Sequence, residues 1–165
     1  MTEKIAILVD SGSDVPKSVL DANPNIAVVP LNITMNGHNY LDAVDITPDE
    51  FYSALATAET LPKTSSPSPH AAKEALARLF AAGYTQILGI TISSALSVTH
   101  HVFQLAAEEF PDKQITILDT KSIGIGSGIQ VAYATSLINA GESFQTLVAK
   151  VEASIVKSRI YFYVP

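Results

Sequence analysis

Four short segments of the sequence concentrate hydroxyl and carboxyl side chains, and each stands directly before a predicted helix. They cover residues 10–14, 64–69, 93–99 and 119–128. The free backbone N–H groups and the dipole of a helix N-terminus favour a bound anion. Ser, Thr and Asp are also the usual capping residues, so capping explains any single segment more simply. Four such segments along one edge of a sheet would indicate an anion site.

The residues around these segments favour a carboxylate over a polyphosphate. A polyphosphate site would normally include lysine, arginine or a metal ion, and only Lys63 and Lys121 lie at the margins of the segments. The glycine-rich run 124–128 is not a dinucleotide fingerprint, because the third glycine would have to stand at Ile129. It also lacks the Gly-Lys-Ser/Thr of a Walker loop. A hydroxyl-lined pocket with little positive charge suits one carboxylate, held by charge-assisted hydrogen bonds.

A serine-dependent hydrolase or acyltransferase is the alternative interpretation. Its nucleophile would be Ser97 or Ser11, with His100 or His101 as the base. Adjacent histidines on a helix point about 100° apart, so at most one of them can face Ser97. The sequence has no Gly-x-Ser-x-Gly elbow at a predicted strand end. A place on the polar surface of the helix is the more common role for such histidines.

The remaining titratable residues give little support for a metal site. His38 and His70 lie near a turn and a helix start and do not have metal-ligand spacing. A Mg²⁺ site is a minority interpretation, and its ligands would be Asp10, Asp14 and Asp119. We expect no cofactor.

Apolar runs that alternate with helical patterns predict an α/β frame for these segments. Predicted strands cover 5–9, 26–33, 86–92, 114–118 and 160–164. Predicted helices start near Pro16 and cover about 47–58, 69–82, 97–110, 122–140 and 143–157. This spacing favours right-handed crossovers, so we expect a three-layer α/β/α, Rossmann-like domain with a mainly parallel sheet. Ligands bind such sheets at the carboxyl ends of the strands.

Proline, glycine and turn residues give more detailed predictions for the region 26–69. Pro30 places the strand 26–33 near a sheet edge or at a bulge, because proline cannot donate to a sheet ladder. Asn36-Gly37 is a tight-turn signal, which predicts a small hairpin within 31–40. The segment 60–69 is rich in Thr, Ser and Pro and is expected to be a loop.

Helix boundaries and buried faces follow from capping and periodicity. Thr47 and Glu50 form a capping-box pattern at the start of one helix. The helix 97–110 is expected to bury Val98, Val102, Leu105 and Ala106. The helix 143–157 has the clearest apolar stripe, made by Phe144, Leu147, Val148, Val151 and Ile155.

Composition and charge narrow the function classes. The chain has 165 residues, 47% of them hydrophobic and 16% charged, which is typical of one folded domain. A net charge of −6 argues against a nucleic-acid or anionic-membrane surface. No apolar run reaches the ~20 residues of a membrane span, and no signal-peptide pattern opens the sequence. The absence of cysteine excludes disulfides, and we expect a cytoplasmic protein.

The order of the motifs resembles that of DegV-family proteins over essentially the whole chain. The opening of that family is similar to Asp10-Ser11-x-x-Asp14, Val29-Pro30-Leu31, Gly37-x-x-Tyr40-x-Asp42 and Phe51-Tyr52. The run 64–69 resembles the family's Thr-Ser-Gln-Pro-Ser motif, with Ser66 in place of Gln. The run 92–99 resembles its Ile-Ser-Ser-x-Leu-Ser-Gly-Thr motif, and 119–128 resembles its Asp-Ser…Ser-x-Gly-x-Gly segment.

The resemblance implies a carrier that holds a long-chain fatty acid and is not itself an enzyme. In that family the carboxylate is held by the Thr of the first motif and a Ser of the second, which correspond to Thr64 and Ser97. Ser65, Ser93 and Ser94 would lie close by. The implied partner is a bacterial fatty-acid kinase subunit that phosphorylates the bound carboxylate, while the carrier supplies no ATP site.

Two departures from the family pattern affect these expectations. Val98 stands where the family has Gly, which matters if the backbone needs a positive φ and is tolerable in the first turn of a helix. Family chains also continue into a second α/β domain, so 1–165 is expected to be an N-terminal domain, truncated at the junction. We then expect weaker binding and self-association through the uncovered face, near Tyr161, Phe162 and Tyr163.

Overall fold

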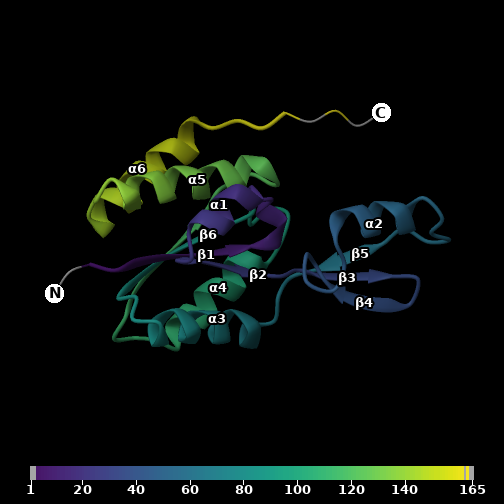
Figure 1. The fold of residues 1–165 in the computed structure, drawn as a ribbon, viewed down its shortest axis with the longest axis horizontal. Coiled ribbons are helices and arrows are strands. Elements are labelled where there is room, and N and C mark those ends of the chain that lie inside the picture. Colours follow the sequence, from purple (N-terminus) through teal and green to yellow (C-terminus); the bar gives the residue numbers. More distant parts are fainter. Residues whose placement is uncertain (1–2, 162, 164–165) are drawn as a thin grey trace.

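The computed structural model describes residues 3–161 and 163, and its main body is a three-layer α/β/α sandwich (Figure 1). The central sheet has four parallel strands in the order β2-β1-β6-β7. They are β1 (Ile5–Asp10), β2 (Ile26–Val29), β6 (Gln86–Thr91) and β7 (Gln114–Asp119). The predicted fold class, a Rossmann-like domain with a parallel sheet, is therefore confirmed for this body.

Helices cover both faces of the sheet because the side chains of its strands alternate between two cores. The helices α5 (Ile125–Asn139) and α6 (Phe144–Lys157) lie on one face, and α3 (Pro69–Ala81) and α4 (Thr99–Glu108) lie on the other (Figure 1). The short α1 (Lys17–Ala22) follows β1. From β1, the side chains of Ile5, Ile7 and Val9 join the core under α5 and α6, whereas Ala6 and Leu8 join the core under α3 and α4.

A small lobe projects from this body (Figure 1). It consists of the antiparallel strands β3 (Asn32–Met35), β4 (His38–Leu41) and β5 (Lys63–Ser65), in the order β4-β3-β5, and the helix α2 (Pro48–Leu55). The lobe has its own core of Ile33, Met35 and Ile46, packed against Tyr40, Phe51 and Ala54.

The local signals in this lobe were predicted correctly. Asn36 and Gly37 have positive φ angles of 50° and 77° and form the turn between β3 and β4. Thr47 and Glu50 form both hydrogen bonds of the capping box at the start of α2. In the main body, the apolar stripe of α6 packs into the core as expected.

Three predicted elements were wrong. The strand 26–33 is divided at Pro30, which has no N–H donor, so β2 and β3 belong to different sheets. The segment 60–69 is not all loop, because β5 pairs with β3 through Ile33 and Thr64, a distant contact that composition does not reveal. Of the predicted strand 160–164, Ile160, Tyr161 and Tyr163 are not in a strand, and Phe162 and Val164 lie outside the described residues.

Two residues that were predicted to lie on the buried face of α4 are exposed. Val98 precedes the helix and is 64% exposed, and Leu105 is also exposed. The buried face of α4 is instead formed by Thr99, Val102, Phe103 and Ala106. The helix begins at Thr99 and not at Ser97, so Val98 lies before its first turn, while Val102 and Ala106 face inward as expected. Within residues 3–161, no helix has the length and apolar character needed to cross a bilayer.

Candidate functional site

The order of the strands places a crevice at the carboxyl ends of β1 and β6. The chain passes from β1 to β2 on one side, and β6 pairs with the other side of β1. Such a reversal of strand order is where open α/β sheets bind their ligands. The crevice is bordered by a 3₁₀ turn after β1, which we call η1 (Ser11–Ser13), and by the loop after β6.

Asp10 ties the two strand ends together at the bottom of this crevice. Its side chain is fully buried, and its Oδ2 accepts a hydrogen bond of 2.9 Å from the backbone N–H of Ile92. The Ser13 hydroxyl lies 3.4 Å from Oδ1. Burial raises the pKa of Asp10 to about 6, although these hydrogen bonds act in the opposite direction.

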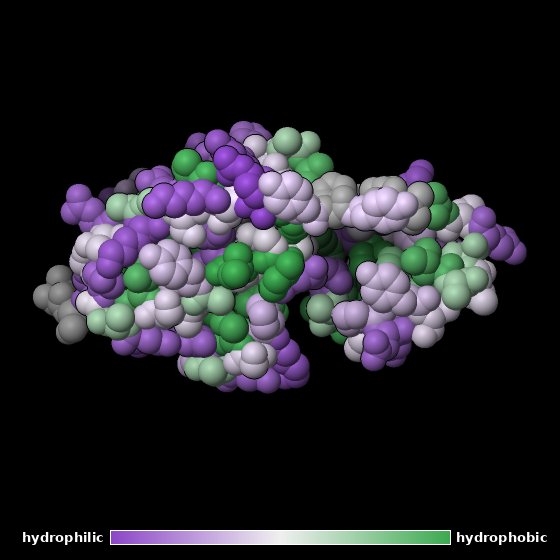
Figure 2. All heavy atoms as spheres, turned by 90° about the horizontal axis from the view of Figure 1, so that it is seen from above, coloured by the Kyte–Doolittle hydropathy of each residue, from purple (hydrophilic) through white to green (hydrophobic). Residues whose placement is uncertain are grey.

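A cavity of about 650 Å³ lies beside the Asp10–Ile92 hydrogen bond, between the body and the small lobe. Figure 2 shows the surface hollowed where the two parts meet, with both hydrophobic and hydrophilic residues around the hollow. The cavity is within the size range of small-molecule sites, about 300–1,000 Å³. Its apolar walls come from Leu31, Ile92, Leu96, Val98, Val102 and Ile123. None of the described residues that line it carries a charge.

Hydroxyl groups gather on one side of the cavity. Thr64 and Ser65 are exposed residues of β5, and Ser66 follows them. The Ser66 hydroxyl lies 2.9 Å from that of Ser97, which comes from the loop before α4. The Ser97 hydroxyl also lies 2.8 Å from that of Thr99 and accepts a 3.2 Å hydrogen bond from the Thr99 N–H. The structure thus brings together Thr64, Ser65 and Ser97, three of the predicted site residues.

Ser93 and Ser94 do not line this cavity. The Ser94 hydroxyl donates to Asp119 Oδ2 at 2.6 Å, and the Ser94 N–H donates to Oδ1. Partial burial alone would raise the pKa of Asp119, but hydrogen bonds from Ser94 and Lys121 outweigh it and lower that pKa. Ser93 is buried, and its hydroxyl accepts a hydrogen bond from the N–H of Ala95. Both serines therefore hold the loops after β6 and β7 in place.

The glycine-rich run at the start of α5 serves close packing. Gly124 has a φ of 56° and donates its N–H to the carbonyl of Gly12 at 2.9 Å. A Cβ on Gly128 would stand 2.5 Å from the carbonyl oxygen of Ser13. The buried hydroxyls of Thr120 and Ser127 lie 2.7 Å apart. The start of α5 is thus pressed against η1, which accounts for the glycines structurally.

Neither serine of the hydrolase alternative has a histidine as a hydrogen-bond partner in the described part of the chain. His100 Nδ1 lies 3.3 Å from the hydroxyl of Thr91. His101 lines a different hollow, beside Phe110 and Ile115. The Ser11 hydroxyl accepts the N–H of Leu31 at 2.9 Å. The geometry therefore gives no support to a Ser–His pair.

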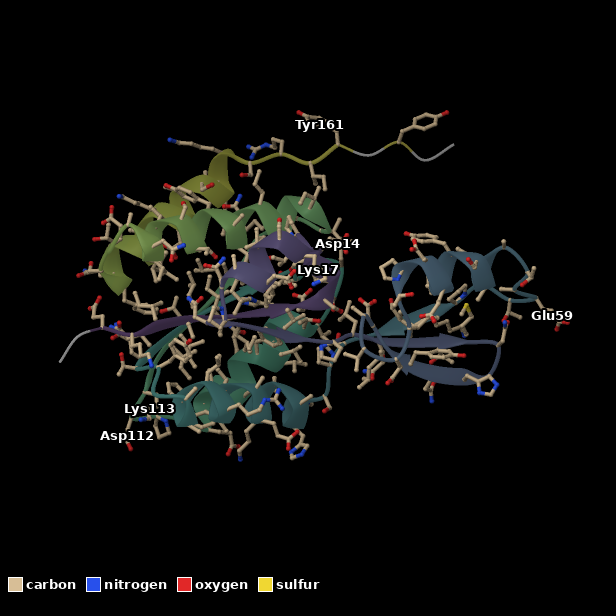
Figure 3. The ribbon with its side chains drawn as sticks, in the orientation of Figure 1. Asp14, Lys17, Glu59, Asp112, Lys113 and Tyr161 are labelled. Atoms are coloured by element: carbon tan, nitrogen blue, oxygen red, sulfur yellow. The ribbon has the colours of Figure 1, made fainter. Side chains whose placement is uncertain are left out.

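A second hollow, of about 460 Å³, lies between η1, α1 and the segment that leads to α2. Its charged lining is mainly acidic and includes Asp14, Asp42 and Lys17, the last of which pairs with Asp21. Asp14 and Lys17 are labelled in Figure 3. Burial, and then the charge of Asp42, raises the pKa of Asp14. Among the described residues no group of three His, Asp or Glu side chains could hold a metal, so Asp10, Asp14 and Asp119 do not form the Mg²⁺ site considered above.

Val98 tests whether the loop before α4 needs glycine. Its φ and ψ are −78° and 5°, which any L-residue can adopt. Val98 therefore causes no backbone strain, and it lines the cavity. Leu31, Ile92 and Val102 were not predicted as cavity walls, because apolar residues near strand ends and in helices carry no local sign of a site.

Comparison with known proteins identifies the family. The sequence model for the uncharacterised proteins of the DegV family matches residues 4–165. The chain belongs to the DegV family. A DegV domain-containing protein of Clostridium acetobutylicum is 35% identical over 162 residues, which is 98% of this chain and 57% of that protein. The predicted resemblance is confirmed.

Solved structures of DegV-family proteins share this fold. A Thermus thermophilus DegV-family protein, described by its fatty-acid binding, is 32% identical with a TM-score of 0.82, over 92% of this chain and 53% of that one. A fatty-acid-binding DegV-family protein of Streptococcus agalactiae is 30% identical with a TM-score of 0.84, over 94% and 54%. The chain spans about half the length of the relatives that it matches.

Proposed function

We propose that this DegV-family chain binds a long-chain fatty acid in the cavity between the body and the small lobe. The observation that carries the proposal is a cavity with apolar walls, a hydroxyl-lined side and no charged lining residue among those described. A fatty acid has the matching chemistry, with an apolar tail and one carboxylate. Related DegV-family proteins described as binding fatty acids support the proposal.

In this proposal the carboxylate accepts hydrogen bonds from Thr64 and Ser97, with Ser65 at the rim. Thr64 has no hydrogen-bond partner for its hydroxyl among the described residues, so that group is available to a ligand. The acidic hollow around Asp14 and Asp42 would instead repel a carboxylate. Ser93 and Ser94 take a supporting role, because their bonds to Ala95 and Asp119 fix the loop that carries Ser97.

The apolar walls would bind the tail. Burial of a CH₂ group contributes about 0.8 kcal/mol, so a tail of palmitate length has roughly 10 kcal/mol available before the costs of association. The exposed side chain of Val98 at the rim would then become covered by ligand.

We also propose that the bound carboxylate is presented to a separate fatty-acid kinase subunit. The motif resemblance supports this part of the proposal. The cytoplasmic location expected from the sequence stays a prediction. So does the self-association of the chain, for which the exposed Ile125, Ile129 and Tyr161 are candidate contacts (Figure 3 labels Tyr161).

Substitution of the two hydroxyl residues tests the proposed site. Thr64→Ala and Ser97→Ala should each weaken palmitate binding by ~1.5–3 kcal/mol, because a hydrogen bond to a charged group is lost. Calorimetric titration of palmitate measures this change. Ser53→Ala, at an exposed residue of α2, is the matched control and should bind as the unsubstituted chain does. Unchanged affinity in both site variants would refute the assignment.

A further inference from the structure

Three hydroxyl groups form a row that leads from the protein interior into the cavity. The Thr99 hydroxyl lies 2.8 Å from that of Ser97, which in turn lies 2.9 Å from that of Ser66. Thr99 is fully buried, and Ser97 and Ser66 are half-buried and line the cavity. Ser66 reaches this row from the end of β5, which belongs to the small lobe.

Burial of Thr99 sets the direction of these hydrogen bonds. A buried O–H without an acceptor is costly. The distance allows either hydroxyl to donate, but among the described residues the Ser97 oxygen is the one hydrogen-bond partner of the Thr99 hydroxyl, so the cost of an unpaired O–H favours Thr99 as the donor. The Thr99 N–H points to the same oxygen at 3.2 Å.

The Ser97 hydroxyl consequently acts as a donor towards the cavity. A hydroxyl has one proton and two acceptor positions, and Thr99 occupies both acceptor positions of Ser97. The Ser97 proton is then directed to the Ser66 oxygen. The Ser66 proton is then left for a group in the cavity.

We infer that Ser66 is a second donor to the fatty-acid carboxylate, and that Thr99 is a positioning residue that makes Ser97 donate. The inference rests on the proposed function and extends it. When a carboxylate enters, Ser97 turns its proton from the Ser66 oxygen to the carboxylate, and Ser66 donates beside it. Their oxygens lie 2.9 Å apart, so both hydroxyls can reach one carboxylate group. Thr99 continues to donate to Ser97 from behind, so the two cavity hydroxyls have no competing acceptor role.

The test is calorimetric titration of palmitate and of methyl palmitate, which has the same tail but no charge. Ser66→Ala should lower palmitate affinity about ten-fold to a hundred-fold, because a charge-assisted hydrogen bond is lost. Thr99→Val removes only the hydroxyl that positions Ser97 and should lower palmitate affinity about three-fold to ten-fold. The affinity for methyl palmitate should change little in either variant. A merely structural defect would instead lower the affinity for both ligands.

Conservative and matched variants complete the design. Ser66→Thr and Thr99→Ser keep the hydroxyls and should restore palmitate affinity. Ser53→Ala and Thr116→Val remove hydroxyls outside the cavity and should leave the affinity for palmitate unchanged. The melting temperature of every variant establishes that it is folded.

Two results would overturn the inference in distinguishable ways. If the unsubstituted chain binds palmitate and Ser66→Ala binds it equally well, or loses both ligands to the same extent, Ser66 is not a headgroup donor and the proposed function stands. If the unsubstituted chain binds neither ligand, the proposed function fails and the inference fails with it.

Discussion

Replacement of Asp10 by Asn should remove a large pH dependence from the stability of the fold. Asp10 is fully buried, and burial raises its pKa from 3.8 to about 6. Because the folded state holds this proton more tightly than the unfolded state, the stabilisation is fully present below pH 3.8. It is lost as the pH rises through about 6.

The magnitude follows from the difference between these two pKa values. Each unit corresponds to 1.36 kcal/mol, so ionisation of Asp10 lowers the unfolding free energy by about 3 kcal/mol between pH values well below 3.8 and pH 7. Asn keeps an oxygen that can accept the N–H of Ile92, while it has no charge to desolvate. The variant should therefore be more stable than the unsubstituted chain at pH 7, by an amount that shrinks towards pH 4.

Urea denaturation across this pH range measures the effect as the difference between the two proteins. Other carboxyls also titrate: Asp14 acts in the same direction as Asp10, and Asp119, with its lowered pKa, acts in the opposite one. The difference between variant and unsubstituted chain cancels both. Asp112→Asn, in the exposed turn before β7 (Figure 3), is the control. A difference that does not vary with pH would refute the reasoning.

Further predictions concern the cavity rim, the helix packing and the exposed surface. Val98→Gly should lower palmitate affinity by about 1 kcal/mol in calorimetry, because an apolar wall is lost; higher affinity would mean that Val98 obstructs the ligand. Gly128→Ala should destabilise the fold by about 1–3 kcal/mol in urea denaturation, because the new Cβ would stand 2.5 Å from the Ser13 carbonyl oxygen; unchanged stability would contradict this packing. Sedimentation should detect self-association that Ile129→Asp weakens, and a clean monomer at all concentrations would disprove it.

The sequence was informative where local patterns decide the structure. Neighbouring residues determine the apolar strands of the central sheet, the capping box at Thr47 and the turn at Asn36. All of these were predicted. Three of the hydroxyl segments follow predicted parallel strands, and such strands share one sheet edge. Thr64 and Ser97 were named through the motif resemblance, and both line the cavity.

Contacts between distant residues were beyond the sequence patterns. The pairing of Thr64 with Ile33 turns a Thr- and Ser-rich stretch into β5, and no local periodicity marks it. Ser94 has a hydroxyl that could bind a ligand, but this hydroxyl donates its hydrogen bond to Asp119. Ser66 stood out only as a departure from a motif, because its partner Ser97 is 31 residues away.

The two links between the body and the small lobe have a consequence for ligand selection. One contains Pro30 and the other Pro67, so the φ angle of each is fixed at these points. The Asn32 side-chain amide donates to the Ser66 carbonyl at 2.9 Å and ties the two links together. These constraints limit how the lobe can turn relative to the body, which reduces the conformational freedom lost on binding. A cavity of restricted shape selects tails by fit, so we expect straight and kinked acyl chains of equal length to bind with different affinities.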